Sequence, residues 1–224
     1  MKVSEALANR KSVRAFLDRP IPQEVLRSVL ERSARAPSGG NLQPWRIYVL
    51  SGARQEAFRE AIRKRLADNP VPDSPAEYSI YPEKLKAPYR DSRFKVGEDL
   101  YGLLGIPRED KAGRMGWFQR NYEFFGAPTS MFCYVDKQMG PPQWSDLGMF
   151  LQSVMLLLQE EGIDTCAQEC WSLYHQSVRE LLGVEEPEWI LFCGMSVGYR
   201  DGADPVNRLV TDREPLENFA TFLE

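Results

Sequence analysis

The chain of 224 residues contains a single histidine, His175. Ser-His-Asp and Cys-His catalytic sites need a histidine as their base, and many metal sites need several histidine ligands. Unless His175 is itself such a base, the sequence therefore excludes hydrolases of these types and multi-histidine metal centres. We predict no metal site, and we expect His175 to have a structural role on a surface helix.

Glycine-rich phosphate motifs are also missing. No G-x-G-x-x-G follows the first expected strand, and no G-x-x-x-x-G-K-[ST] occurs anywhere. The first motif cradles the pyrophosphate of a dinucleotide, and the second cradles the phosphates of a nucleoside triphosphate. A dinucleotide bound tightly on a Rossmann unit and P-loop phosphoryl transfer are therefore both excluded.

Cysteine is scarce and does not form C-x-x-C pairs. The four cysteines are Cys133, Cys166, Cys170 and Cys193, and three of them lie in apolar or strand-like stretches. Small secreted domains stapled by disulfides carry more cysteines, at higher density. The pattern favours reduced, mostly buried thiols in a cytoplasmic protein over a disulfide framework.

Long apolar runs are absent. Residues 1–5 contain no apolar run, so we expect no signal peptide. The longest apolar stretch, 147–158, is too short to span a bilayer and contains Gln152. We therefore expect a protein without a membrane partner.

The charge is unevenly distributed along the chain. The formal net charge is −4, from 28 Lys and Arg against 32 Asp and Glu. Residues 1–68 carry 14 basic and 7 acidic side chains, whereas 69–224 carry 14 and 25. An acidic protein with a basic N-terminal part is not typical of a nucleic-acid binder. The imbalance predicts a local anion site near the N-terminus instead.

Helical and strand patterns alternate along the chain, which indicates one α/β or α+β domain over 1–224. Apolar periodicity and capping residues predict the helices, and short apolar runs predict the strands. The expected helices are 4–10, 22–36, 54–66, 93–104, 108–125, 145–161 and 172–182, and the expected strands are 45–50, 129–135, 163–167 and 189–197.

Three segments stand apart from this pattern. The helix 145–161 is apolar nearly all round, which indicates either a central core helix or a helix at a dimer interface. Residues 69–91 are rich in Pro and Tyr and are expected to form a long ordered insertion. The tail from about 199 holds few core residues, as is typical of a segment anchored on a partner subunit.

Two polar motifs near the N-terminus carry the strongest functional signal. Arg10-Lys11-Ser12-Val13-Arg14 places three cations and a hydroxyl within five residues, a set suited to phosphate. The run 36–45, Ala-Pro-Ser-Gly-Gly-Asn-Leu-Gln-Pro-Trp, offers glycines for close backbone approach and uncharged donors and acceptors. Taken alone, the first motif could be a solvated surface patch and the second a plain turn.

Together with two later blocks, these motifs resemble the FMN-dependent nitroreductase family. The blocks are Asp146-Leu147-Gly148 with Gln152 and 162–166, and Arg213-Glu214-Pro215-Leu216 near the C-terminus. The resemblance extends over about 8–219 and is weakest over 68–125. Residues 101–104 and 121–128 are most similar to the 4-nitrobenzoate-reductase branch.

The resemblance implies an α+β fold with a central mixed sheet flanked by helices, assembled as an intertwined homodimer. FMN is expected at the dimer interface, with Arg10, Lys11 and Arg213 at its phosphate and Arg14 near the pyrimidine edge. The loop around Ser38 is expected to come from the opposite subunit. The full set of implied FMN-binding residues is Arg10, Lys11, Ser12, Arg14, Pro37, Ser38, Gly39, Asn41, Gln43, Ala167, Gln168, Glu169 and Arg213.

Three positions depart from the family pattern. Many relatives have Pro where this chain has Ala167 and Gly where it has Cys170. Many also carry a Lys where this chain has Thr211. We expect either that Arg208 replaces that charge or that fewer cations hold the phosphate.

The implied activity is reduction of nitroaromatic compounds, and of quinones, with NADPH or NADH as donor. Hydride passes through flavin N5 with ping-pong kinetics, so no catalytic side chain is required. The variable segment 69–125 is expected to cover the substrate, with Tyr101, Trp117 and Phe124 as contact residues. Alternatives are reductive dehalogenation, flavin fragmentation or metabolite dehydrogenation on the same fold, a non-enzymatic flavin-binding protein, and an apo dimer.

Overall fold

The computed structural model describes residues 1–185 and 188–223. Helices and strands alternate as the sequence predicts, with boundaries shifted by a few residues. The helices are α1 (Val3–Asn9), α2 (Gln23–Ser33), α3 (Gly52–Asp68), α4 (Tyr89–Leu103), α5 (Lys111–Gln119), α6 (Pro141–Glu160) and α7 (His175–Leu182). The strands are β1 (Arg46–Ser51), β2 (Thr129–Asp136), β3 (Asp164–Gln168) and β4 (Trp189–Gly198). Short 3₁₀ helices η1 (Gly39–Asn41), η2 (Arg120–Gly126), η3 (Glu169–Tyr174), η4 (Pro205–Arg208) and η5 (Leu216–Asn218) lie between or after them.

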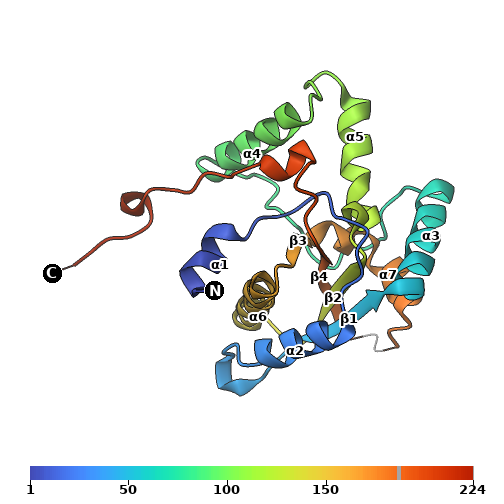
Figure 1. Cartoon of the computed structure of the whole chain (residues 1–224), viewed down its shortest axis with the longest axis horizontal. Coiled ribbons are helices and arrows are strands. Elements are labelled where there is room, and N and C mark those ends of the chain that lie inside the picture. The colour runs from blue at the N-terminus through green and yellow to red at the C-terminus, as the bar shows by residue number, and fades with distance from the viewer. Residues whose placement is uncertain (186–187, 224) are drawn as a thin grey trace.

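The sheet has the order β1-β2-β4-β3, and each of these neighbouring pairs is antiparallel. The α+β class is confirmed, but the expected mixed sheet is wrong for these four strands. Strands β2 and β4 read as continuous apolar runs, which is typical of parallel sheets with both faces covered. Here helices cover both faces of an antiparallel sheet, so the same pattern arises without parallel pairing (Figure 1).

Alternating residues of β2 enter two separate cores. Met131, Cys133 and Val135 pack on the face covered by α2 and α6. Phe132 and Tyr134 pack on the other face, against α3, α7, η2 and η3. Burying a large apolar side chain contributes about 1.5–3 kcal/mol. The central strand, buried on both faces, therefore stabilises the fold from two sides.

Helix α6 begins at Pro141, four residues before the expected N-cap Ser145. Proline fits the first turn because its missing N–H needs no partner there. The Gln143 side chain also accepts from the Gly140 backbone N–H at 3.1 Å, which closes the turn. The helix is not buried on all sides in this chain: Phe150 and Val154 lie in the core, whereas Met149 is 40% exposed.

Two other expected helices are divided. The pattern over 108–125 gives α5 and then η2, and within η2 Phe124 and Phe125 adopt left-handed φ values of 52° and 53° that no α-helix accommodates. The pattern over 172–182 gives η3 and then α7, which starts at His175.

The insertion 69–91 is ordered, and its first half is a strap, residues 70–78, laid on α7 and β4. Asp73 accepts from the backbone N–H groups of Gln176 (2.9 Å) and Ser177 (3.1 Å) and pairs with Arg65 at 3.0 Å. Tyr78 donates to the Phe192 carbonyl at 2.5 Å. The strap is therefore part of the folded body.

His175 lies under this strap and is buried, so the expected surface position is wrong. Its Nε2 lies 3.0 Å from the Pro75 carbonyl oxygen, and its Nδ1 lies 3.5 Å from Glu77 Oε1. The hydrogen bond with Glu77 raises the pKa of His175 despite partial burial. Burial raises the pKa of Glu77, but the His175 hydrogen bond, the Leu191 N–H and the neighbouring positive charges together lower it. These buried contacts agree with the expected structural role.

The segment after α1 lies beside β3 and the segment that follows β4. A parallel bridge joins Ser12 to Thr165, and an antiparallel bridge joins Phe16 to Arg200. Beyond η4 the tail leaves the body and extends outward (Figure 1). Leu216, Phe219 and Phe222 are exposed there.

Candidate functional site

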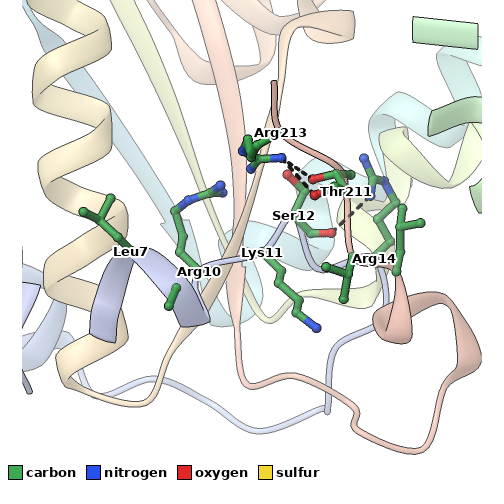
Figure 2. A pocket seen from close by; sticks show the side chains of 10 residues that line it. Leu7, Arg10, Lys11, Ser12, Arg14, Thr211 and Arg213 are labelled. Atoms are coloured by element: carbon green, nitrogen blue, oxygen red, sulfur yellow. Dashed lines mark hydrogen bonds between the residues drawn. The ribbon is translucent and has the colours of Figure 1, made fainter. Parts of the chain in front are cut away.

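A cavity of about 320 Å³ lies where the N-terminal segment meets the C-terminal tail. In the view of Figure 2, Arg213 and Thr211 of the tail lie between Arg10 and Arg14 of the N-terminal segment. The cavity is lined by Leu7, Ala8, Arg10, Lys11, Ser12, Arg14, Leu209, Val210, Thr211 and Arg213. The structure therefore brings together five of the predicted site residues, from opposite ends of the polypeptide.

Extended backbone after α1 arranges the first wall. Arg10 leaves the helix with ψ of 125°, and Val13 N–H donates to the Thr165 carbonyl at 2.9 Å. Side chains alternate in extended backbone, so Val13 and Ala15 enter the core while Ser12 and Arg14 face outward. Lys11 falls on the opposite side from Arg10 and also lines a second cavity, next to Arg200 (Figure 2).

The tail fixes the orientation of Arg213. Its Nη1 donates to Thr211 Oγ1 at 2.6 Å and to the Asp212 carbonyl at 2.7 Å (Figure 2). Thr211, where the family resemblance leads one to expect a lysine, therefore orients the arginine. Arg208 is exposed and does not line the cavity, which favours the expectation that fewer cations serve this site.

The cavity is electrostatically unbalanced. Its lining contains four cations and no carboxylate. Within residues 1–185 and 188–223, no ion pair joins Arg10, Lys11, Arg14 or Arg213 to an acidic side chain. By contrast, Arg200 nearby is bound to Asp164 through two hydrogen bonds of 2.7 and 3.1 Å. Converging cations without counter-ions are the arrangement that binds a phosphate or carboxylate.

The glycine loop 37–43 lies elsewhere, against the start of α6. Gly40, Asn41 and Gln43 all have positive φ values between 49° and 58°, which are strained for the two non-glycine residues. Two hydrogen bonds hold this shape: Gly39 N–H donates to the buried Asp146 carboxylate at 3.2 Å, and Gln43 N–H donates to Ser38 Oγ at 3.0 Å. The loop does not line the cavity of its own chain.

The third predicted group lies at the end of β3. The Gln168 amide is buried and fully engaged: Nε2 donates to the Asn121 carbonyl at 2.8 Å, and Oε1 accepts from Ser196 Oγ at 2.6 Å. Its side chain therefore holds η2 in place, while Ala167 and Glu169 on either side are exposed. Burial raises the pKa of Cys166 and Cys170, so neither thiol supplies a thiolate.

The predicted substrate residues have different environments. Phe124 is completely buried and stacks on Trp171 with ring centroids 4.6 Å apart, so the structure gives it a packing role. Tyr101 and Trp117 are half-buried between α4, α5 and η2. Arginines lie over both rings: Arg114 at 4.2 Å from Tyr101 and Arg120 at 4.5 Å from Trp117.

Sequence reasoning did not identify Asp146 as a ligand of the loop or Asn207 as a link to the N-terminal segment. No spacing rule shows such contacts, because 107 and 193 residues separate the partners.

The run from Gly194 to Gly198 has the G-x-S-x-G spacing of an esterase elbow. It lies inside β4, however, where Ser196 is buried, so it lacks the exposed strand-to-helix turn of an elbow.

Across the described ranges 1–185 and 188–223, no helix combines the length and apolarity needed to cross a bilayer. Within the same ranges, no three His, Cys, Asp or Glu side chains gather as a metal site.

Comparison with known proteins identifies the family of the chain. The model of the nitroreductase family matches residues 7–199. A 4-nitrobenzoate reductase of Nocardioides sp. (strain LMS-CY) is 35% identical over 215 residues, which cover 96% of this chain and 87% of that protein. The crystal structure of the FMN and NADPH-dependent nitroreductase NfnB from Sphigopyxis sp. strain HMH matches with a TM-score of 0.94, 47% identity and full coverage of both chains. The FMN-dependent nitroreductase NfnB from Mycobacterium smegmatis, in complex with NADPH, matches with a TM-score of 0.92 and 30% identity over 99% of this chain and 98% of that one. On these similarities, the chain belongs to the nitroreductase family.

Proposed function

We propose that this protein is an FMN-dependent NAD(P)H oxidoreductase that reduces nitroaromatic compounds, and also quinones. The observation that carries the proposal is the cavity between the chain ends, where Arg10, Arg14 and Arg213 converge without carboxylate partners. The cofactor is supported by full-length relatives, among them the FMN and NADPH-dependent enzyme that is 47% identical.

The residues of the cavity fit the phosphate of FMN. Arginine presents a planar fork of donors that matches phosphate oxygens, and Arg10 of the N-terminal segment and Arg213 of the tail supply two such forks. Ser12 adds a neutral hydroxyl, and Lys11 contributes charge from the far side of its strand. A phosphate monoester carries close to two negative charges at neutral pH, which this lining would neutralise.

When bound, FMN supplies hydride transfer from NADPH or NADH to an electron-poor aromatic acceptor. In this proposal Arg14 would place positive charge near the pyrimidine edge of the ring, where it would favour the negative charge of the reduced cofactor. The backbone at Ala167–Glu169 would border the ring. Hydride transfer through a flavin requires no side chain as acid or base. Burial raises the pKa of the Cys166 thiol, so it stays protonated at neutral pH.

The functional unit in this proposal is a homodimer. The loop residues Pro37, Ser38, Gly39, Asn41 and Gln43 do not line the cavity of their own chain, so in this proposal they border the cavity of a second copy. The outward tail with Phe219 and Phe222 and the exposed face of α6 at Met149 provide apolar surface for that contact.

Tyr101 and Trp117 are the proposed acceptor contacts. The free cysteines fit a cytoplasmic enzyme.

The test compares Arg10→Ala and Arg213→Ala with Arg208→Ala, a matched arginine outside the cavity. Removing a charge-assisted hydrogen bond costs about 1.5–3 kcal/mol, so each cavity variant should bind FMN at least about 10-fold more weakly. The riboflavin affinity of the two cavity variants should equal that of the wild type. The FMN affinity of Arg208→Ala should also be unchanged. Fluorescence titration with FMN and riboflavin measures both.

Activity is tested anaerobically with NADPH and NADH, followed by 4-nitrobenzoate, a quinone and a halophenol as acceptors. Bleaching of the flavin spectrum by a nicotinamide and its recovery with 4-nitrobenzoate are expected. Recovery with the halophenol alone would show dehalogenation. Bound FMN that no nicotinamide reduces would show a non-enzymatic flavin protein, and a protein that takes up no FMN would exclude both.

A further inference from the structure

Asn207 links the C-terminal segment to the N-terminal segment at Arg14, a residue that lines the cavity. Asn207 is only 9% exposed. Its Oδ1 accepts from the Arg14 backbone N–H at 2.9 Å, and its Nδ2 donates to the carbonyls of Ala15 (2.8 Å) and Asp201 (2.9 Å). Both amide hydrogens and the amide oxygen are therefore engaged, which fixes the orientation of the side chain.

The side-chain amide of Asn207 continues a row of backbone hydrogen bonds between the N-terminal and C-terminal segments, a row that stops before it reaches Arg14. Between these segments the backbone itself supplies Leu17 N–H to the Tyr199 carbonyl at 2.8 Å and Asp201 N–H to the Ala15 carbonyl at 3.0 Å. The C-terminal chain then turns into η4, so no backbone carbonyl there reaches Arg14. The Asn207 oxygen takes the place of that missing carbonyl.

Asn207 is itself held in place by its surroundings. Asp204 Oδ1 accepts from the Val206 N–H at 3.0 Å, which caps η4, and Pro205 fixes the first turn. Val206 is 2% exposed and anchors the turn in the core. A side chain projecting from such a turn has little freedom, so the position of Arg14 is determined by η4.

Both walls of the cavity depend on this contact. On one side, the fixed backbone of Arg14 carries its guanidinium into the cavity, where Nη1 donates to the Ser12 carbonyl at 3.1 Å. On the other side, Leu209 follows Asn207 by two residues and starts the lining that leads to Thr211 and Arg213.

We propose that Asn207 is a positioning residue that sets Arg14 against the flavin, an inference that rests on the proposed function. It does not line the cavity, so it acts through Arg14. The charge of Arg14 matters more for the reduced flavin, which is anionic, than for the neutral oxidised ring. Displacing it should therefore weaken binding of reduced FMN more than binding of oxidised FMN.

The test measures the midpoint potential of bound FMN by dye equilibration, together with the melting temperature. In Asn207→Ala the affinity for reduced relative to oxidised FMN should fall about tenfold, which equals about 30 mV for a two-electron couple. Asn207→Ser, a smaller change that preserves a polar side chain, should shift the potential in the same direction by less. Asn218→Ala removes an exposed tail asparagine and should leave the potential unchanged.

A double-mutant cycle separates positioning from a merely structural role. Arg14→Ala should lower the potential at least as much as Asn207→Ala, and Asn207→Ala should add little in the Arg14→Ala background. A lower melting temperature with an unchanged potential, or fully additive shifts, would overturn the positioning role. A wild-type protein that binds no flavin would overturn the proposed function as well.

Discussion

The sheet and the α4–α5 region differ sharply in how much of themselves they bury. From Thr129 to Val135 each residue of β2 is buried, whereas none of the residues of α4 or α5 is. Tyr89, Phe94 and Met115 are each more than half exposed on those helices, as are Phe219 and Phe222 on the tail. A single chain therefore completes the sheet core but leaves its outer helices and tail without enough apolar contact.

This contrast separates stability from function within one polypeptide. The sheet core supplies the folding free energy and the fixed frame for Ser12 and Thr165. The outer regions carry the half-buried aromatic rings and the residues expected to meet a second subunit. Segments with few buried contacts open at low free-energy cost, so they are the parts that a ligand or partner can order.

The largest expected effect tests whether the tail needs a partner. Phe219→Ser with Phe222→Ser removes two exposed aromatic side chains per protomer, each worth about 1.5–3 kcal/mol if buried between subunits. The dimer dissociation constant should rise at least about 1,000-fold, or about 4 kcal/mol. Sedimentation equilibrium measures this. Val71→Ser changes an exposed apolar residue in the strap and should leave the dimer dissociation constant unchanged. A wild-type protein that is monomeric would show that the tail does not need a partner.

The next effect compares two glycines, one in each region. A Cβ at Gly194 in β4 would lie 2.3 Å from Trp171 Cδ1, whereas a Cβ at Gly97 in α4 would meet nothing within 4 Å. Gly194→Ala should lower the free energy of unfolding by about 3 kcal/mol through overpacking. Gly97→Ala should raise it by about 0.5–1 kcal/mol through helix propensity. Urea denaturation measures both, and equal effects would refute the contrast.

A smaller effect locates the boundary between the regions. Asp73 in the strap is buried, pairs with Arg65 and caps α7, whereas Asp91 in α4 forms an exposed pair with Arg90. Asp73→Ala should cost about 2 kcal/mol, since it removes a cap and strands a partly buried arginine. Asp91→Ala should change the unfolding free energy by less than about 0.5 kcal/mol. Comparable losses would place α4 inside the stable body.

The smallest effect is a pH dependence of the strap. The pKa of His175 is raised above its ordinary 6.5, so its contribution is complete below pH 6.5 and is lost as pH rises through the folded-state pKa. The pKa of Glu77 is lowered from 4.5, so its contribution is complete above pH 4.5 and is lost as pH falls through the lowered value. The stability difference between wild type and His175→Gln should therefore be largest between these limits, about 1 kcal/mol, and smaller at pH 8.5. If the difference in unfolding free energy between wild type and His175→Gln grew as the pH rose, the pKa of His175 would not be raised by folding.

Local chemistry explains which features the sequence could predict. Proline, capping residues and apolar periodicity predicted the elements, and the family motifs predicted that Arg10 and Arg213 share a cavity. Strand direction was not predictable, because β2 has the same apolar pattern in either direction once helices cover both faces. The left-handed backbone at Phe124 and the hydrogen bond between Asn207 and Arg14 depend on contacts between residues distant in sequence. The spacing of residues along the chain does not show such contacts.

The cavity joins residues that are about 200 positions apart, which constrains how the protein matures. Arg213 emerges from the ribosome long after Arg10, and until it does the anion site has only one wall. In the proposed function, FMN therefore binds only after nearly the whole chain shown here has been synthesised. A truncated product that lacks the tail could build its sheet and still emerge colourless.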